Sequence, residues 1–381
     1  MVVSASMYSG LYAGAYDEQE EGHPRLPYDV LYSVFSYVDF DTLKMLSSLS
    51  SVCRKCTAHR LWRSFTISVD KGLTGGIAIH GASHLLRMVK LIRDEVRAEH
   101  IQVLRIRIYA PIDNAAGDWG LKGRINSLYD AIQGLSALYC LQLDTVVHRE
   151  EFAHGLMGRS FAPGLEMCIF NVSSLPVEGL DDIFEGMRGL RSLRWTNDHY
   201  KRRTIQEVQP LAKPLPSLNE LVVYGAQYAA LMRGSPVSHL TVHSLNPSHS
   251  SMLLAHIQAS TSPLVHLQLD FGLTQVVKPL PVFRDLLQHL SSLLYLEIMV
   301  DPWPDGSNEG VQCLAYLATL PKVEEFVWKG ASCYWQKHIC SVANTSGFTN
   351  LQHGTFLYRV DNRSLVREDG LAVLKDLYLC S

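Results

Sequence analysis

A six-residue pattern of apolar and polar positions recurs along the middle of the 381-residue chain. In each copy the first, fourth and sixth residues are apolar, as in LVHLQL at residues 264–269. The alternation at the end of each copy is typical of a short β-strand with one buried face. The nine copies occupy residues 101–106, 138–143, 165–170, 190–195, 218–223, 237–242, 264–269, 293–298 and 323–328.

The spacing of these copies predicts a repeating strand–helix unit. Between Cys168 and Phe326 the fourth residues follow one another at intervals of about 26 residues, which is typical of a repeat protein. Segments before and between the copies, such as residues 84–96 and 281–290, carry apolar residues at helical spacing. Stacked units bury their apolar residues against each other, with parallel strands on a concave face and helices outside. The sequence therefore predicts an α/β solenoid.

In this array the sequence resembles the leucine-rich repeat family over about residues 101–330. It departs from the family shortly after the strand, where Asn or Cys is usual and this chain has Val146, Gly272 and Asp301. The intervals between copies also range from 19 to 37 residues. We therefore expect an irregular leucine-rich-repeat solenoid over residues 83–330, closed by a C-terminal cap over residues 331–381. The exact repeat number stays open.

A second apolar pattern lies near the start of the chain, in RLPYDVLYSVFSYVDFDTL at residues 25–43. After Pro27, which suits a first helical turn, apolar residues recur from Val30 onward as one helical stripe. Asp41 is expected to cap a second helix, and a third helix is expected over residues 52–60. Three short helices bury too little surface to be stable alone, so this stripe is predicted to meet another surface.

The segment of residues 25–68 resembles an F-box, the three-helix motif that docks onto the adaptor of SCF ubiquitin ligases. The matching elements are Leu26-Pro27, Val30-Leu31, Val34-Phe35-Ser36, Leu43 and Leu61-Trp62. VCRK at residues 52–55 lies a few residues later than the similar tetrapeptide of the family. The resemblance implies an adaptor protein as partner and, through it, the cullin and RING subunits. The adaptor-binding residues that it implies are Leu26, Pro27, Val30, Leu31, Val34, Phe35, Leu43, Leu46 and Trp62.

The alternative is that the same helices only cap the first repeat of the solenoid, since repeat arrays need capped ends. Trp62 and Phe65 would then face the repeats. The two roles are compatible if the stripe on the first helix faces the adaptor.

The outward positions of the predicted strands are candidates for binding a target protein. Arginines dominate the first repeats and carboxylates occur in later ones, so this face would orient a charge-complementary partner. A merely solvated strand face is the alternative. Two insertions, residues 197–208 and 301–310, are expected to add contacts. The candidate target-binding residues are Arg105, Arg107, Arg194, Tyr224, His243, Asp270, Glu297 and Trp303.

Composition narrows the choice of partner and compartment. The formal net charge of −3 gives no electrostatic argument for nucleic acid or an anionic membrane, and no apolar run approaches the ~18 residues that cross a bilayer. Eight scattered cysteines indicate reduced thiols in a cytoplasmic and/or nuclear protein. Residues 1–24 lack a secretory signal pattern and are expected to form a flexible tail. Residues 69–82, which are rich in glycine, are expected to form a linker.

No motif in the sequence predicts a catalytic or metal site. CRKC, from Cys53 to Cys56, has the spacing of zinc and redox sites, but no second pair lies at a ligand-like distance. GLTGGIAIHG at residues 72–81 lacks the Lys and Ser/Thr of a phosphate-binding loop. We therefore predict no catalytic residue, no metal and no cofactor.

The co-occurrence of an F-box-like segment and a repeat array favours a substrate-receptor subunit of an SCF-type ubiquitin ligase, itself without catalytic activity. The alternative is a leucine-rich-repeat scaffold that binds partners without ubiquitination. An enzyme of unknown type is the least favoured hypothesis, since no Ser/His/Asp or paired-carboxylate arrangement stands out.

Overall fold

The structure, a computed structural model, divides into two compact units. The first comprises Met1–Gly189 with Asn197–Tyr200, and the second comprises Leu190–Thr196 with Lys201–Ser381. Among the described residues, no helix combines the length and the apolar character needed to span a bilayer. The structure describes residues 26–69, 78–108, 118–145, 155–172, 179–196, 208–271, 286, 289–299, 322–329, 353–360 and 364–369.

Three short helices form the helical segment at the start of the first unit. They are α1 (Tyr28–Phe35), α2 (Phe40–Leu49) and α3 (Ser51–Leu61). Their shared core contains Phe35, Leu43, Cys56 and Leu61, all of which are buried. These helices lie close to where the apolar pattern of the sequence predicts them.

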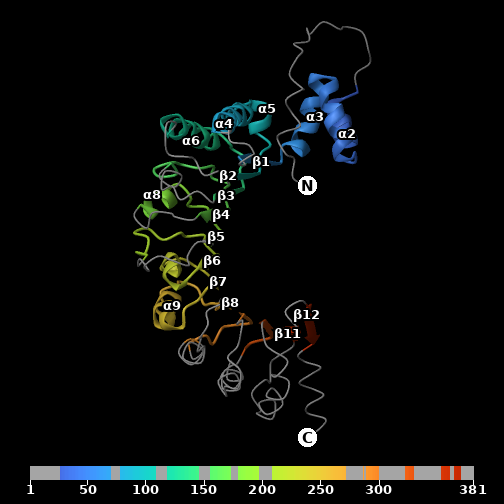
Figure 1. Cartoon of the computed structure of the whole chain (residues 1–381). Helices are drawn as coiled ribbons and strands as arrows, with labels where there is room; N and C mark the ends of the chain where they lie inside the picture. The colour runs from blue at the N-terminus through green and yellow to red at the C-terminus, as the bar shows by residue number, and fades with distance from the viewer. Residues whose placement is uncertain are drawn as a thin grey trace. The chain divides into compact units, whose positions relative to one another are not determined.

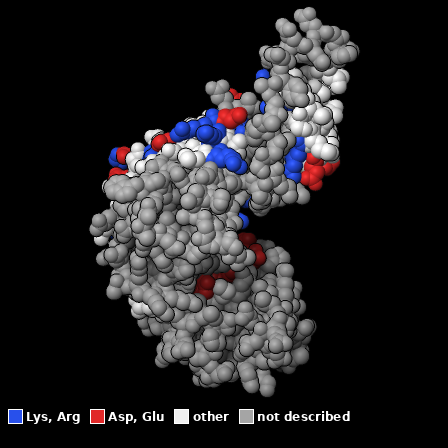
Figure 2. All heavy atoms as spheres, turned by 45° about the horizontal axis from the view of Figure 1, so that its top comes forward, with Lys and Arg blue, Asp and Glu red and all other residues white. Residues whose placement is uncertain are grey.

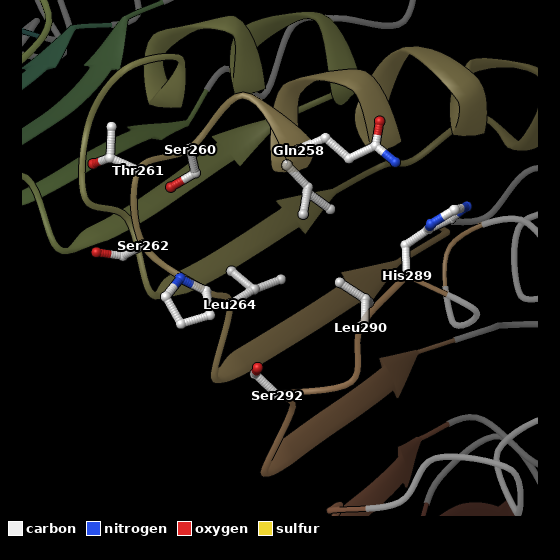
Figure 3. A pocket seen from close by; sticks show the side chains of 10 residues that line it. Gln258, Ser260, Thr261, Ser262, Leu264, His289, Leu290 and Ser292 are labelled. Atoms are coloured by element: carbon white, nitrogen blue, oxygen red, sulfur yellow. The ribbon is translucent and has the colours of Figure 1, made fainter.

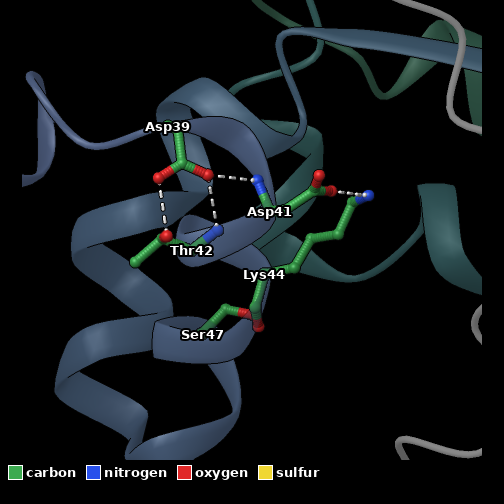
Figure 4. Close-up of polar contacts among 5 residues, drawn as sticks. All are labelled: Asp39, Asp41, Thr42, Lys44 and Ser47. Atoms are coloured by element: carbon green, nitrogen blue, oxygen red, sulfur yellow. Dashed lines mark hydrogen bonds and ion pairs between the residues drawn. The ribbon is translucent and has the colours of Figure 1, made fainter.

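Helix α2 begins where the side chain of Asp39 caps it. One carboxylate oxygen of Asp39 accepts hydrogen bonds from the backbone N–H groups of Asp41 (3.1 Å) and Thr42 (3.0 Å), as Figure 4 shows. Asp41, the cap expected from the sequence, instead lies in the first turn and pairs with Lys44 at 2.9 Å. The expected cap is wrong by two residues, because Asp39 has the extended backbone of an N-cap and Asp41 is already helical.

Parallel strands form the described sheet of the first unit, in chain order. They are β1 (Ser64–Val69), β2 (Val103–Ile108), β3 (Cys140–Thr145) and β4 (Met167–Val172). The helices that follow the helical segment are α4 (Ala78–Ile92), α5 (Glu95–Ala98), α6 (Asp118–Gln133) and α8 (Leu180–Glu185). Figure 1 shows α4, α6 and α8 on the same side of these strands. None of these three helices covers the opposite side of the strands, which is here called the open face of this sheet.

Strand β1 begins within the predicted F-box-like segment of residues 25–68, after the third helix. It pairs with β2 along its whole length. Phe65 and Ile67 are buried while polar residues alternate with them, and alternation with β-branched residues favours a strand. The helical segment therefore ends at Leu61. The expected linker over residues 69–82 is also shorter, since α4 begins at Ala78.

The second unit has the same strand arrangement. Its parallel strands, again in chain order, are β5 (Ser192–Thr196), β6 (Glu220–Tyr224), β7 (His239–His243), β8 (His266–Asp270), β9 (Tyr295–Met299), β10 (Glu325–Lys329) and β11 (His353–Val360). Strand β12 (Ser364–Asp369) pairs antiparallel with β11. The helical elements described here are η3 (Ala226–Met232), η4 (Pro247–His249) and α9 (Ser250–Gln258). The expected cap over residues 331–381 thus contains one more parallel strand before the antiparallel one.

The strand register explains how the repeated pattern builds a core. All nine predicted strands are confirmed, and each begins two residues after the first apolar residue of its copy. The fourth residues of neighbouring copies lie opposite each other, so that Leu240 has Leu221 on one side and Leu267 on the other. These three leucines are fully buried, and burying one leucine contributes about 2 kcal/mol. Each repeat is therefore stabilised by both of its neighbours.

Candidate interaction surfaces

Apolar side chains at four-residue intervals are exposed along α1. Leu26, Val30 and Val34 are exposed by 59%, 39% and 50%. Pro27, the residue that precedes the helix, is also exposed. Val30 and Val34 are four residues apart and therefore lie on one face of α1. Together with Leu26 and Pro27, which directly precede the helix, they are here called the α1 stripe (Leu26, Pro27, Val30 and Val34). Exposed apolar surface of this kind is a candidate docking site.

The other side of α1 packs into the core of the helical segment. Phe35 is 6% exposed and Leu43 is 0% exposed, while Leu31, Leu46 and Trp62 are partly buried against the same core. The expectation that Phe35 and Leu43 face a partner is therefore corrected, because a side chain that fills the core presents no surface. Among the nine expected adaptor-binding residues, the α1 stripe contains the four that are exposed.

Contacts from α3 hold the C-terminal end of α1. The Nη1 atom of Arg60 donates hydrogen bonds to the carbonyl oxygens of Phe35 (2.7 Å) and Val38 (2.6 Å). The ring of His59 stacks on Tyr32, with ring centroids 4.1 Å apart. Burial lowers the pKa of His59, so the stacked ring is neutral at neutral pH. The α1 stripe therefore projects from a helix that is fixed on its opposite side.

Other apolar side chains of the helical segment are also exposed, and the sequence analysis missed them. They are Tyr28, Tyr32, Tyr37, Met45 and Leu49. Met45 and Leu49 are four residues apart, which is the signal that would have grouped them on one face of α2. Figure 2 shows a broad uncharged surface on this part of the molecule, with Asp and Glu atoms beside it.

In the first unit, the predicted arginines lie on the open face of the sheet. Arg105 and Arg107 of β2 are both half-buried. The Nε atom of Arg107 lies 3.9 Å from Oδ2 of Asp144 on β3. Asn171 of β4 donates a hydrogen bond from Nδ2 to Asp144 (3.1 Å). Arg107 is thus part of a polar row across three strands.

The second unit brings three predicted residues together on the face of its sheet opposite α9. The rings of Tyr224 and His243 have centroids 6.5 Å apart, and Nδ1 of His243 lies 3.3 Å from Oδ2 of Asp270. Arg194 lies at another position, where Nη2 donates a hydrogen bond to Oε1 of Glu220 (3.1 Å). The predicted residues therefore make cross-strand pairs with their neighbours.

Glu297 is the most enclosed of the predicted residues in the second unit. It is 6% exposed and accepts hydrogen bonds from Nε2 of Gln268 (2.7 Å) and the hydroxyl of Tyr295 (2.9 Å). These bonds offset the cost of burying a carboxylate. Trp303 lies outside the described residues, as do both predicted insertions except for Val208.

A row of aromatic rings on the same face was missed by the sequence analysis. His239, His266 and Tyr295 occupy matching positions of β7, β8 and β9. Their ring centroids are 5.4 Å apart between the two histidines and 4.0 Å apart between His266 and Tyr295. Each residue immediately precedes a buried core leucine, and strand alternation places such a residue on the outward face. That alternation is the sequence signal that could have placed these three rings on the outward face.

The described part of the chain also contains a small cavity. Its volume is about 230 Å³, and it lies between the end of α9 and the turn before β9, where Ser260, Thr261, Ser262, His289 and Ser292 contribute to its lining (Figure 3). The Ser260 hydroxyl is engaged with the carbonyl oxygens of two neighbouring residues. Among the described residues, no group of three His, Cys, Asp or Glu side chains is arranged to hold a metal ion.

Comparison with known proteins adds no family assignment. No protein-family model matches the chain, and no curated protein matches it in sequence. The exposed α1 stripe and the outward strand faces of the two units are therefore the features that bear on function.

Proposed function

We propose that the protein is the substrate-receptor subunit of an SCF-type ubiquitin ligase. In this proposal the helical segment is an F-box that docks onto the adaptor, and the repeats form an irregular leucine-rich-repeat solenoid that binds a target protein. The observation that carries the proposal is the α1 stripe, which leaves apolar side chains exposed on a helix whose other face is packed. The F-box-like sequence of the same helix supplies the class of partner that covers it.

The energetics of the α1 stripe suit a docking site. Burying one aliphatic side chain contributes about 2 kcal/mol, so a few such anchors account for much of a stable interface. Because Arg60 and the core hold α1 in place, little ordering of the helix is needed when a partner binds. Preorganisation and apolar anchors together favour a specific protein contact.

The proposed role of this chain in ubiquitin transfer is positional. The adaptor links the helical segment to the cullin and RING subunits, and the repeats hold the target near the ubiquitin thioester. Raising the local concentration of target lysines accelerates transfer without any bond chemistry in this chain. The compartment proposed for this activity is the cytoplasm, the nucleus or both.

A substitution in the α1 stripe tests the adaptor contact. We expect Val34→Asp to reduce co-purification of the adaptor by about tenfold or more, because the interface would bury an unpaired carboxylate. Leu26→Ala/Pro27→Ala should also weaken binding, by truncating two further contacts. The measurement is adaptor recovered with the tagged full-length chain from eukaryotic cells.

The matched control is Leu86→Asp, which introduces the same charge at an exposed apolar residue of α4. Its adaptor recovery should equal that of the wild type, with circular dichroism verifying the fold of every variant. Equal recovery with Val34→Asp would refute the docking site. Proteasome inhibition then separates a receptor from a non-degradative scaffold, since only a receptor's targets accumulate on the wild-type chain and not on Val34→Asp.

A further inference from the structure

The open face of β6–β9 presents its aromatic row with a carboxylate at each end. Strand register places Glu220 beside His239 and Glu325 beside Tyr295. His266 stacks between His239 and Tyr295 in the middle of the row. The sequence of side chains across five strands is therefore acid, three stacked rings and acid. Because stacked rings expose their edges and not their faces, the row presents a flat surface of polar ring edges between the two carboxylates.

A third carboxylate lies at the next outward position of the same strands. Glu297 accepts hydrogen bonds from Tyr295 and from Gln268. Both donors are neutral groups. Glu297 lies close to Glu325, because strand register pairs Glu325 with Tyr295 and Val327 with Glu297.

The outward positions of β6–β9 are uniform in the sign of their charge. Each of these strands has three such positions, and the full set contains carboxylates but neither Lys nor Arg. The carboxylates are Glu220, Asp270 and Glu297. Cations occupy outward positions on both flanking strands. Lys329 of β10 lies four residues beyond Glu325, in register with Met299. Arg194 of β5, in register with Val222, is 47% exposed at its side chain and pairs with Glu220 at 3.1 Å. An exposed pair of this kind is weak, so a partner's cation can compete with it.

His266, the central ring of the row, does not repel a cation at neutral pH. Burial, and then the neighbouring His239, lower the pKa of His266, against the opposing effect of Glu297, Glu220 and Glu325. The central ring is therefore neutral near pH 7, and the surrounding carboxylates dominate the local field.

We propose that this face binds an extended basic segment of the target protein, rich in Lys or Arg. The inference rests on the proposed function, because it names the chemistry of the target that the repeats hold. The row from Glu220 to Glu325 crosses five strands, so its ends are about 19 Å apart at ~4.8 Å per strand. An extended segment of about six residues spans that length. Charge complementarity selects a basic segment and disfavours acidic peptides and nucleic acid phosphates.

Peptide binding to the purified full-length chain tests this inference without any adaptor. The probes are three labelled peptides of equal length that alternate Ser with Arg, with Gln or with Glu. We expect fluorescence anisotropy to show the Arg peptide binding about tenfold or more tightly than either of the others, with an affinity that falls as salt rises. Equal binding of the three peptides, or no binding of the Arg peptide, would overturn the inference.

Neutral substitutions locate the binding site. Glu325→Gln and Glu220→Gln should each weaken binding of the Arg peptide by about threefold, and the double variant by about tenfold. Glu324→Gln is the matched control, since Glu324 is exposed and adjacent in sequence but precedes the strand. Equal effects of Glu324→Gln and Glu325→Gln would place the peptide elsewhere and refute the site. Adaptor co-purification with the same variants is expected to be unchanged, so failure here is distinguishable from failure of the proposed function.

Discussion

Adjacent residues of α1 have different environments at the scale of single side chains. Val34 is exposed and Phe35 is buried, because successive residues of an α-helix point about 100° apart. The bonds from Arg60 to Phe35 and Val38 then fix the rotation of the helix. One guanidinium therefore helps decide which apolar side chains face solvent. The α1 stripe depends on that orientation as much as on its own residues.

His256 of α9 should make stability depend on pH. Its Nδ1 atom is buried and has no hydrogen-bond partner among the described residues, and burial, followed by the charge of Arg233, lowers its pKa to about 4. As the pH falls, the unfolded chain therefore binds a proton at His256 before the folded protein does. The contribution of the neutral ring to the free energy of unfolding is complete above pH 6.5 and is lost as the pH falls toward 4. Relative to His256→Gln, the wild type should lose about 2 kcal/mol over that range, allowing for the ring's partial exposure.

Urea denaturation of both proteins at steps between pH 7.5 and pH 4.5 measures this difference. His289→Gln is the control, since His289 is exposed. Parallel stability curves for wild type and His256→Gln would contradict the assignment.

At the scale of elements, period-two alternation predicted all nine strands. The helical spacing at residues 84–96 falls on Ala78–Ile92 and Glu95–Ala98, and residues 281–290 lie mostly outside the described residues. The nine copies fix their strands because each needs its fourth residue opposite that of its neighbours, as for Leu193 and Leu221. The connecting segments need only return the chain, so they take the form of an α-helix at Ala78–Ile92 and of a 3₁₀-helix at Ala226–Met232. The aromatic row of His239, His266 and Tyr295 was missed because its residues become neighbours only once the strand register is known, as with His266 and Tyr295.

A core position in the middle of the second unit tests the contribution of stacking. Leu240 is fully buried, with Leu221 and Leu267 in register on its two sides. Leu240→Ala should lower the free energy of unfolding by about 3 kcal/mol, because it removes buried methyl groups and leaves a cavity. The partly exposed Leu294 provides the control, and Leu294→Ala should cost less than about 1 kcal/mol. Similar losses for both variants, measured by chemical denaturation, would argue against a continuous core.

At the scale of the whole molecule, β1 decides where the helical segment can be separated from the repeats. The carbonyl oxygen of Arg63 accepts hydrogen bonds from the backbone N–H groups of Gln102 and Val103. The guanidinium of Arg97 lies 4.7 Å from the ring centroid of Trp62. Trp62 thus contacts both the core of the helical segment and Arg97, whereas residues from Arg63 onward belong structurally with the sheet of the first unit, although the F-box-like sequence includes them.

Two truncations are expected to behave differently for this reason. A fragment that begins at Trp62 should remain monomeric, because β1 still covers the edge of β2. A fragment that begins at residue 70 lacks β1 and should aggregate, because the exposed edge and apolar face of β2 can pair with other chains. Size-exclusion chromatography with light scattering distinguishes the two outcomes.

The Trp62 fragment should also lose the adaptor while it keeps the Arg peptide, since the α1 stripe is absent and the open face of β6–β9 is intact. Aggregation of both fragments alike would show that the helical segment is needed for the sheet, and would favour its role as a cap over its role as a separate docking module.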